Sequence, residues 1–295
     1  MNGVVVIDKP QGMTSHDVVD RVRRILKQRS VGHLGTLDPS ATGVLPIVTG
    51  SLTRLAQFYL HSEKKYEGEI RFGFATDTYD ADGEATTPVS EVNLDHDRLK
   101  TLAAEFRGVI EQIPPPFSAK KIAGVPAYKL ARKKQEVVLK PVNVEIHDFE
   151  VLDVLRDRAR FRARVASGTY MRSVAHDMGQ KLGCGAHLAS LRRTAVAEFV
   201  LEDAHTLEEL EKAAQQGSAE DFFVHPRKLL PEFPGVTASD ESAALIRSGR
   251  SVNLPEFSKA TRVKVFYGQA ELIAIATRVA GTLFHPGIVL MGSGG

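Results

Sequence analysis

The sequence predicts a protein of mixed helices and strands, with a large main body followed by a small β-rich domain. Residues 65–74 alternate apolar and polar side chains with the period of two that is typical of a strand with one buried face. Residues 18–26 place apolar side chains at the spacing of one helical face. Residues 226–235 contain three prolines and a glycine, which indicate a linker. Short strand-like segments follow it. A chain of 295 residues is long enough for both parts.

The N-terminal region predicts a short buried strand, a turn and a helix. Residues 4–7 are an apolar run that ends in a turn containing proline and glycine. Thr14, with the acidic Asp17 three residues later, is typical of a helix N-cap, and the apolar helical stripe follows. Further along, an apolar run at residues 44–48 precedes a second predicted helix over residues 52–60.

Residues 31–43 show neither helical nor strand periodicity. They contain three glycines, a histidine, three small hydroxyl residues and one carboxylate, Asp38. This composition suits a loop that approaches a ligand closely, because glycine permits backbone conformations that other residues avoid. An ordinary turn is about as compatible with the composition. The segment is therefore the first candidate for a functional site.

The middle of the chain adds strands, helices and a basic segment. The acidic turn at residues 77–84 superficially resembles a calcium loop but lacks the full ligand spacing, so a hairpin turn is expected. A helix is predicted over residues 99–106. Residues 119–134 contain six basic residues and no acidic one, which is typical of a phosphate-binding arm, with a solvated charged loop as the less favoured alternative. The six are Lys120, Lys121, Lys129, Arg132, Lys133 and Lys134.

Two strands are predicted next, at residues 142–146 and 158–165. In the second, apolar residues alternate with Arg158, Arg160, Arg162 and Arg164. One face of this strand is expected to lie in the core, and the arginine face contacts either solvent or RNA. Periodicity alone does not decide between them.

A helix follows, with an apolar stripe over residues 174–182 and Gly183 at its end. Arg172 lies near the start of this helix, where the helix dipole disfavours a cation, so a carboxylate partner is expected. A loop entering a strand is predicted over residues 188–201, and a helix over residues 206–214. The C-terminal strands are expected at residues 262–266, 272–277 and 282–290.

Several classes of site are not expected. Cys184 is the single cysteine, so no intrachain disulfide is possible, and no two histidines fall at the spacing of a helical metal site. The chain has neither of the glycine-rich motifs that bind ATP or dinucleotides, nor a Gly-x-Ser-x-Gly elbow. With no signal peptide and no apolar membrane span, we expect a soluble cytoplasmic protein. The net charge of +2 does not by itself indicate a nucleic-acid partner.

Five motifs in the chain, in their order and spacing, resemble those of the bacterial TruB-type tRNA pseudouridine(55) synthase family. They are Asp8-Lys9-Pro10-Gln11-Gly12-Met13-Thr14-Ser15, Gly32-His33-Leu34-Gly35-Thr36-Leu37-Asp38-Pro39, Lys65-Tyr66, Gly168-Thr169-Tyr170-Met171-Arg172-Ser173 and Leu191-Arg192-Arg193-Thr194. The resemblance runs from near residue 3 to about residue 225. Any single motif would be weak evidence, whereas five in order are specific.

The resemblance implies an α+β architecture, the pseudouridine synthase fold with a large mixed central sheet. Residues 1–225 would form the catalytic domain, with a basic arm at about residues 114–142. Residues 226–235 would be a linker, and residues 236–295 a PUA-like RNA-binding domain. The implied activity is the isomerisation of uridine to pseudouridine at position 55 in the T-loop of tRNA. It would proceed by base flipping, without a cofactor or metal.

The resemblance also implies roles for three catalytic residues. Asp38 would act on the flipped nucleotide, either at the uracil ring or by removing a ribose proton to form a glycal. Tyr66 would stack on the target base and take its C5 proton, although the strand pattern alone also fits a core tyrosine. Arg172 would pair with Asp38, which answers the question of its partner.

Further residues would bind the substrate. His33 would occupy the place of the extruded base, and Tyr170 and Leu191 would line the uracil pocket. The candidates for RNA contact are Lys9, Lys120, Lys121 and Arg132. Extrusion of a base costs a few kcal/mol, which stacking and phosphate contacts must offset.

The expected partner is the T-arm of tRNA, with no obligatory protein partner and a monomeric enzyme. Two alternatives remain open at this point. An RNA-binding protein or tRNA-folding chaperone would have the architecture without turnover. A related guide-RNA-dependent synthase would need partner proteins.

Overall fold

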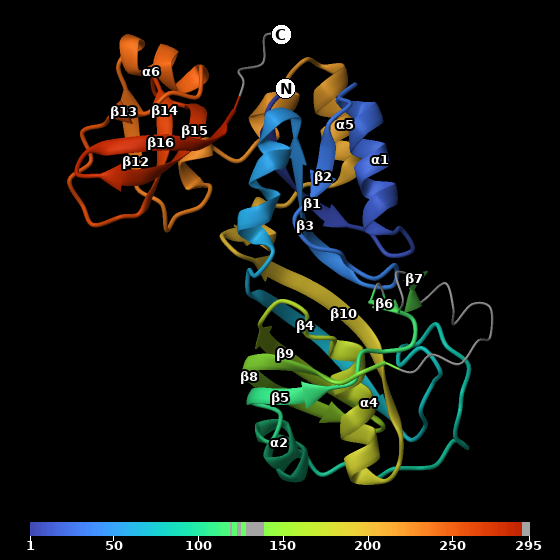
Figure 1. Cartoon of the computed structure of the whole chain (residues 1–295). Helices are drawn as coiled ribbons and strands as arrows, with labels where there is room; N and C mark the ends of the chain where they lie inside the picture. Colours follow the sequence, from blue (N-terminus) through green and yellow to red (C-terminus); the bar gives the residue numbers. More distant parts are fainter. Residues whose placement is uncertain (119, 123–124, 128–138, 291–295) are drawn as a thin grey trace. The chain divides into compact units, whose positions relative to one another are not determined.

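The computed structural model describes residues 1–118, 120–122, 125–127 and 139–290 (Figure 1). Its backbone contacts divide the chain into two compact units. Unit 1 comprises residues 1–38, residues 43–60 and the chain from residue 198 onward, and unit 2 comprises residues 39–42 and 61–197. The chain therefore leaves unit 1 directly after Asp38.

Unit 1 contains a three-stranded antiparallel arrangement. Strand β3 (Thr42–Thr49) pairs with β1 (Gly3–Lys9) and with the short β2 (Val31–His33). The apolar run at residues 4–7 is at most 1% exposed, so β1 lies in the core as predicted. The chain returns to β1 at His205, whose backbone pairs with Ile7. This return explains why the residues after 198 belong to unit 1.

Helices α1 (Ser15–Ile25) and α5 (Leu207–Gln215) lie side by side in unit 1 (Figure 1). The predicted N-cap of α1 is present as a complete capping box. Thr14 Oγ1 accepts from Asp17 N at 3.1 Å, and Asp17 Oδ2 accepts from Thr14 N at 2.8 Å. The Asp17 carboxylate also accepts from the Thr14 hydroxyl at 2.7 Å, and this bond, together with the one from the Thr14 amide, holds the pKa of Asp17 below its usual value. The helix that was predicted over residues 52–60 is instead the 3₁₀ helix η1 (Gly50–Tyr59).

The C-terminal part of unit 1 is a five-stranded sheet with one helix, which confirms the small β-rich domain. The strand order is β12-β14-β15-β16-β13. The elements are β12 (Gly235–Ala238), α6 (Asp240–Arg247), β13 (Val252–Asn253), β14 (Arg262–Tyr267), β15 (Glu271–Ala280) and β16 (Leu283–Val289). The three longest strands match the predicted ones. Residues Val236, Ile246, Val263, Ile273 and Phe284 contribute to its own apolar core.

Short elements connect the body of unit 1 to this sheet. They are β11 (Phe199–Val200), η2 (Leu201–Asp203), η3 (Ala219–Phe222) and η4 (Pro226–Lys228). After η4, Leu229 and Leu230 are at most 1% exposed. The buried Lys264 of β14 donates from Nζ to the carbonyl oxygens of Arg227 at 3.0 Å and Leu229 at 2.6 Å. The predicted linker segment is therefore packed and hydrogen-bonded.

Unit 2 is built on antiparallel strands in the order β10-β4-β9-β8-β5. The strands are β4 (Lys64–Phe72), β5 (Gly108–Gln112), β8 (Val142–Leu155), β9 (Arg158–Val165) and β10 (Ala186–Val196). Helix α4 (Met171–Leu182) packs on β10, and α2 (His96–Ala104) packs on β8. β6 (Lys121–Ile122) and β7 (Val125–Pro126) form a short hairpin.

Most predicted elements of unit 2 are present. β4 alternates as expected, with Ile70 and Phe72 each 1% exposed, and α4 ends at Gly183 in the left-handed conformation with φ +74°. The acidic turn at residues 77–84 is a hairpin turn closed by an antiparallel bridge between Thr76 and Ala85. The predicted loop at the start of residues 188–201 is wrong, because β10 already begins at Ala186.

The arginine face of β9 is a ladder of ion pairs. The pairs are Arg158–Glu69, Arg160–Asp153 (3.1 Å), Arg162–Glu150 (2.8 Å) and Arg164–Glu63 (3.0 Å). Each arginine is thus balanced by a carboxylate on a neighbouring strand or just before one. This balance favours solvent over RNA as the surroundings of that face.

In the part of the chain that the structure describes, no helix is long and apolar enough to span a membrane.

Candidate active site

The loop that carries Asp38 is fastened to the start of α1. Ser15, which is 2% exposed, donates from Oγ to the carbonyl of Leu37 at 3.1 Å and accepts from the Leu37 amide at 2.8 Å. The residue before Asp38 is therefore held on both sides of its backbone. Leu34 and Leu37 are each 4% exposed, so they anchor the loop in the core while Asp38 stays half-buried. Sequence reasoning missed Ser15, although the motif at residues 8–15 contains it.

We expect the substitution Ser15→Ala to loosen the Asp38 loop. It removes both hydrogen bonds to Leu37 and leaves buried backbone groups without this partner, which costs about 1–3 kcal/mol of the free energy of unfolding. Chemical denaturation measures this loss, and turnover should fall with it because the carboxylate is less well placed. Ser15→Cys and Ser51→Ala serve as controls of size and of generic serine loss. Unchanged stability and turnover in Ser15→Ala would show that the bonds to Leu37 do not hold the loop.

His33 and Gly35 shape the other end of this loop. β2 extends to His33, so the first residues of the 31–43 segment form a strand where only a loop was expected. His33 is half-buried, and its Nδ1 accepts from the Gly35 amide at 3.2 Å. Gly35 has φ +134°, a conformation that side chains with a Cβ rarely adopt. The glycine therefore allows the backbone to turn back onto the imidazole.

The predicted contact between Lys9 and RNA needs correction. Lys9 is 0% exposed, and its ammonium group donates to the carbonyl oxygens of Pro10 at 2.9 Å and Met13 at 2.6 Å. The side chain fastens the turn between β1 and α1 from the inside. A buried and hydrogen-bonded ammonium does not reach a phosphate, so we assign Lys9 to the structure of this turn.

In unit 2, the strands β4 and β10 bring together Tyr66 and two residues of the fifth motif. Leu191 lies opposite Gly68 and Arg193 lies opposite Tyr66 in the antiparallel register. Tyr66 is 6% exposed, and its side chain is hydrogen-bonded to the fully buried Arg193. Leu191 is half-buried. The family resemblance implies no role for Arg193.

Arg172 is held at the start of α4 by groups of unit 2. Its guanidinium lies 3.4 Å from the Asp80 carboxylate and donates to the carbonyl oxygens of Thr78 at 3.1 Å and Phe117 at 3.0 Å. The side chains of Arg172 and Asp80 are only 6% and 10% exposed. The expectation of a carboxylate partner is confirmed, and the partner found here is Asp80. The pairing of Arg172 with Asp38 stays a prediction, because the two residues belong to different units.

The N-terminus of α4 is fixed by a buried glutamine that sequence reasoning missed. Gln112, which is 1% exposed, donates from Nε2 to the Tyr170 carbonyl at 3.1 Å and accepts from the Tyr170 amide at 2.9 Å. Ser173 Oγ donates to the Ile113 carbonyl at 2.7 Å. The half-buried Tyr170 and the neighbouring Arg172 are thereby set in fixed positions relative to β5.

The candidates in the basic arm are described only in part. Lys120 is exposed, and Lys121 lies in β6. Arg132 lies outside the described residues, as do Lys129, Lys133 and Lys134.

Asp177, one turn after Arg172 on α4, makes stability depend on pH. Burial raises the pKa of its carboxyl from 3.8 to about 6, and the charge of Lys181 opposes this only in part. A raised pKa in the folded state stabilises the fold below pH 3.8, and this contribution is lost as the pH rises to about 6. We expect Asp177→Asn to be more stable than the wild type at pH 7, by about 1–2 kcal/mol once screening of the partly exposed carboxyl is counted. The difference should vanish below pH 4 in denaturation curves, and a constant difference at all pH values would contradict the assignment.

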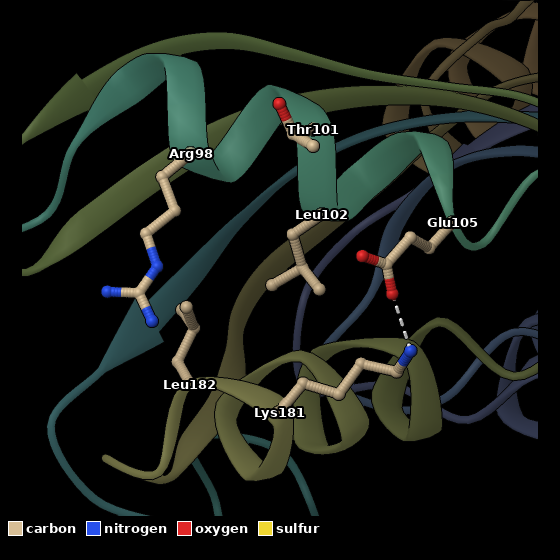
Figure 2. A pocket seen from close by; sticks show the side chains of 6 residues that line it. All are labelled: Arg98, Thr101, Leu102, Glu105, Lys181 and Leu182. Atoms are coloured by element: carbon tan, nitrogen blue, oxygen red, sulfur yellow. Dashed lines mark hydrogen bonds and ion pairs between the residues drawn. The ribbon is translucent and has the colours of Figure 1, made fainter.

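A pocket of about 460 Å³ lies between α2 and the end of α4, away from these residues (Figure 2). Arg98, Thr101, Leu102 and Glu105 face Lys181 and Leu182 across it, and Lys181 pairs with Glu105 at 2.7 Å. None of the predicted site residues lines this pocket. Among the described residues, no group of histidine, cysteine and acidic side chains could hold a metal ion.

Two family models match the chain. One is described as TruB family pseudouridylate synthase (N terminal domain) and matches residues 23–171. The other is described as tRNA pseudouridylate synthase B C-terminal domain and matches residues 172–231. Both matches end before the five-stranded sheet at the C-terminus begins.

Curated proteins and solved structures resemble the chain along nearly its whole length. The tRNA pseudouridine synthase B of Solibacter usitatus is 50% identical over 98% of this chain and 100% of its own. The protein of the same name from Aquifex aeolicus is 40% identical over 96% and 98%. A chain in the crystal structure of a Cbf5-Nop10-Gar1 complex matches with a TM-score of 0.70 and 26% identity, over 98% of this chain and 83% of that one.

These matches confirm the α+β pseudouridine synthase fold, with its mixed sheet and β-rich C-terminal domain. Within each unit the paired strands of the body are antiparallel, whereas β12 and β14 of the C-terminal sheet pair in parallel. The first family model matches residues 23–171, about half of the chain, and the two relatives match 96–98% of it. A resemblance of this length is not limited to part of a fold. The chain belongs to the TruB family of pseudouridylate synthases, and it is an isomerase.

Proposed function

We propose that this enzyme isomerises uridine to pseudouridine at position 55 in the T-loop of tRNA. The observation that carries the proposal is the 50% identity, over 98% of this chain and the whole of the relative, with a protein named tRNA pseudouridine synthase B. The T-loop site comes from the five motifs of the sequence, all of which lie in the matched region. The substrate also makes the cytoplasm the expected location.

The proposed reaction begins with extrusion of the target nucleotide, with His33 occupying the vacated place. Breaking the stack costs a few kcal/mol, which stacking of the uracil on Tyr66 and contacts with Tyr170 and Leu191 would offset. The half-buried Asp38 then acts as the nucleophile or the base, on a loop that Ser15 holds in place. Both routes remain open, attack at the uracil ring and removal of a ribose proton to form a glycal.

Arg172 would keep the Asp38 carboxylate ionised and oriented during the reaction. Its guanidinium is fixed by Asp80 and two carbonyl oxygens, so orienting the Asp38 carboxylate costs little of its side-chain freedom. After the uracil has rotated and bonded to the sugar through C5, Tyr66 would take the C5 proton. No step of this sequence uses a cofactor.

The basic arm and the C-terminal sheet would extend the RNA interface. Lys120, Lys121 and Arg132 would contact phosphates of the T-arm, which supplies affinity that falls as the salt concentration rises. The sheet from β12 to β16 would act as the PUA-like RNA-binding module. In this proposal residues 1–225 form the catalytic domain, and residues 226–235 connect it to that module.

The enzyme is proposed to act as a monomer without an obligatory protein partner. The solved structures that it resembles include a Cbf5-Nop10-Gar1 complex at 26% identity and an archaeal Nop10-Cbf5 complex at 25% identity. The relatives named tRNA pseudouridine synthase B are 40–50% identical. The sequence is therefore much nearer to the tRNA enzymes than to the chains in those complexes.

Mass mapping of one unmodified tRNA transcript, incubated with the purified chain alone, tests the proposal. We expect one pseudouridine at position 55, together with release of tritium from C5-labelled uridine. Product at another position would refute the T-loop site. Binding without tritium release would favour an RNA chaperone, and turnover only after addition of a guide RNA and partner proteins would favour a guide-dependent synthase.

A further inference from the structure

Arg193 is the largest of the side chains that are almost completely buried. It is 0% exposed and lies in the interior of β10, directly opposite Tyr66 of β4 in the antiparallel register. A guanidinium is seldom buried unless its charge has a partner, because removal of a charge from water costs several kcal/mol. Because Arg193 lies opposite Tyr66, the Tyr66 side chain is the neighbour on which its charge acts.

The two side chains are hydrogen-bonded to each other. A guanidinium has donors only, so Arg193 donates and the phenolic oxygen of Tyr66 accepts. Burial lowers the pKa of the Arg193 guanidinium, while the contact with Tyr66 raises it. An arginine nevertheless remains protonated, because the guanidinium holds its proton even in protein interiors. The permanent positive charge of the Arg193 guanidinium therefore lies beside the phenolic oxygen of Tyr66.

A second cation reinforces this field. Lys64 precedes Tyr66 by two residues, so both side chains project from the same face of β4. Burial, together with the charge of Arg193, lowers the pKa of Lys64 to about 8. Lys64 Nζ donates to the Ser62 carbonyl at 3.0 Å. Arg193 is fully buried and Lys64 is half-buried, so their charges are screened less than those of exposed side chains.

We propose that Arg193 is a positioning residue that stabilises the phenolate of Tyr66 and fixes its oxygen, so that Tyr66 can accept the C5 proton of the rotated uracil. The inference deepens the proposed function and rests on the role proposed there for Tyr66. It assigns a purpose to a residue of the Leu191-Arg192-Arg193-Thr194 motif that no substrate contact explains.

The step balances as follows in atoms and electrons. The phenolic proton of Tyr66 leaves to solvent before the step, which leaves the phenolate beside Arg193. Once C5 is bonded to the sugar, the phenolate takes the proton from C5, and the electron pair of the C5–H bond forms the C5=C6 double bond of the product. At the same time C6 gives up one bond. On the glycal route the C6=N1 π pair moves to N1, and on the route through attack at the ring the C6–O pair leaves with the Asp38 carboxylate. N1, which has lost its bond to the sugar, gains a proton from water. The neutral phenol then returns its proton to solvent.

The test compares Arg193→Gln with the wild type on tRNA that carries either uridine or 5-deuterouridine at the target position. Removal of the charge should lower kcat by about 10²-fold, the range typical of impaired proton transfer, with KM for tRNA unchanged. Because C5 deprotonation then limits the rate, a deuterium isotope effect should appear in the variant and be larger than in the wild type. A structural defect would lower kcat without creating an isotope effect.

A second substrate isolates the same step. 5-Fluorouridine has no C5 proton, so its conversion to a C5-linked base does not use Tyr66 as a base. Arg193→Gln should convert 5-fluorouridine tRNA in the first turnover at the wild-type rate. Arg162→Gln, which removes an exposed arginine of the same sheet, is the matched control and should behave as the wild type with both substrates.

The outcomes separate this inference from the proposed function. No pseudouridine from the wild type at position 55 refutes the proposed function, and full activity of Tyr66→Phe refutes the role of Tyr66. If both hold, equal slowing of the two substrates without an isotope effect, in a folded Arg193→Gln protein, overturns the role of Arg193. Should Arg193→Gln fail to fold, Arg193→Lys keeps a charge without the planar donor. An unchanged kcat and isotope effect in that variant overturn the positioning role.

Discussion

Replacement of Asp38 by asparagine is expected to abolish pseudouridine formation, by at least about 10⁴-fold in kcat, with near-normal folding and tRNA affinity. An amide can neither attack the uracil ring nor remove a ribose proton, so both open routes lose their reacting group. Folding should survive, because the loop is anchored by Leu34, Leu37 and the two hydrogen bonds of Ser15. Asp38 itself is only half-buried.

Single-turnover conversion of a tRNA transcript measures the loss, and filter binding measures the affinity. Asp203→Asn is the matched control, since it makes the same change at an exposed carboxylate of the same unit. It should retain wild-type turnover. Substantial pseudouridine formation by Asp38→Asn would remove Asp38 from the chemistry and, with it, the central part of the proposed mechanism.

The features that the sequence revealed are those decided by near neighbours in the chain. The capping box of Thr14 and Asp17 joins residues three apart. Gly183 ends α4 with φ +74°, a conformation that glycine adopts readily because it has no Cβ. The alternation in β4 reflects a single buried face. Such local signals need no knowledge of the rest of the fold.

Features that depend on distant pairing were missed or misjudged. Residues 50–59 form a 3₁₀ helix, and apolar spacing alone does not separate it from an α-helix. The start of β10 looked like a loop because its partners lie in other parts of the sequence. Lys9 looked like a surface cation, although the turn that follows β1 supplies two carbonyl oxygens to its ammonium group.

The candidate site shows the same division. Family motifs pointed to Asp38, Tyr66 and Arg172, whereas the residues that hold them became visible only in three dimensions. Ser15 reaches the backbone of Leu37, and Gln112 reaches that of Tyr170. The oddity of a cation at a helix start did predict a carboxylate partner. Only the fold could identify it as Asp80, because four carboxylates lie in the same turn region, at positions 77, 80, 82 and 84.

Removal of the Asp80 charge is expected to damage both stability and catalysis. In Asp80→Asn the Arg172 guanidinium stays buried without that carboxylate, which costs about 3–5 kcal/mol of the free energy of unfolding. Asp80 Oδ1 also accepts from Thr78 Oγ1 at 2.5 Å and from the Asp82 amide at 3.2 Å. The turn that supplies the Thr78 carbonyl to Arg172 should therefore loosen together with the ion pair.

Catalysis should fall because Arg172 then has no fixed orientation towards the reacting carboxylate, and a misplaced group costs about 10²-fold in rate. Denaturant unfolding and single-turnover kinetics at saturating tRNA measure the two effects. Asp153→Asn, which breaks the exposed pair with Arg160, is the matched control and should cost at most about 1 kcal/mol without a change in turnover. Equal effects of the two substitutions would mean that burial of the Arg172–Asp80 pair contributes nothing. A stable Asp80→Asn protein with normal turnover would show that the carbonyl oxygens of Thr78 and Phe117 suffice to hold Arg172.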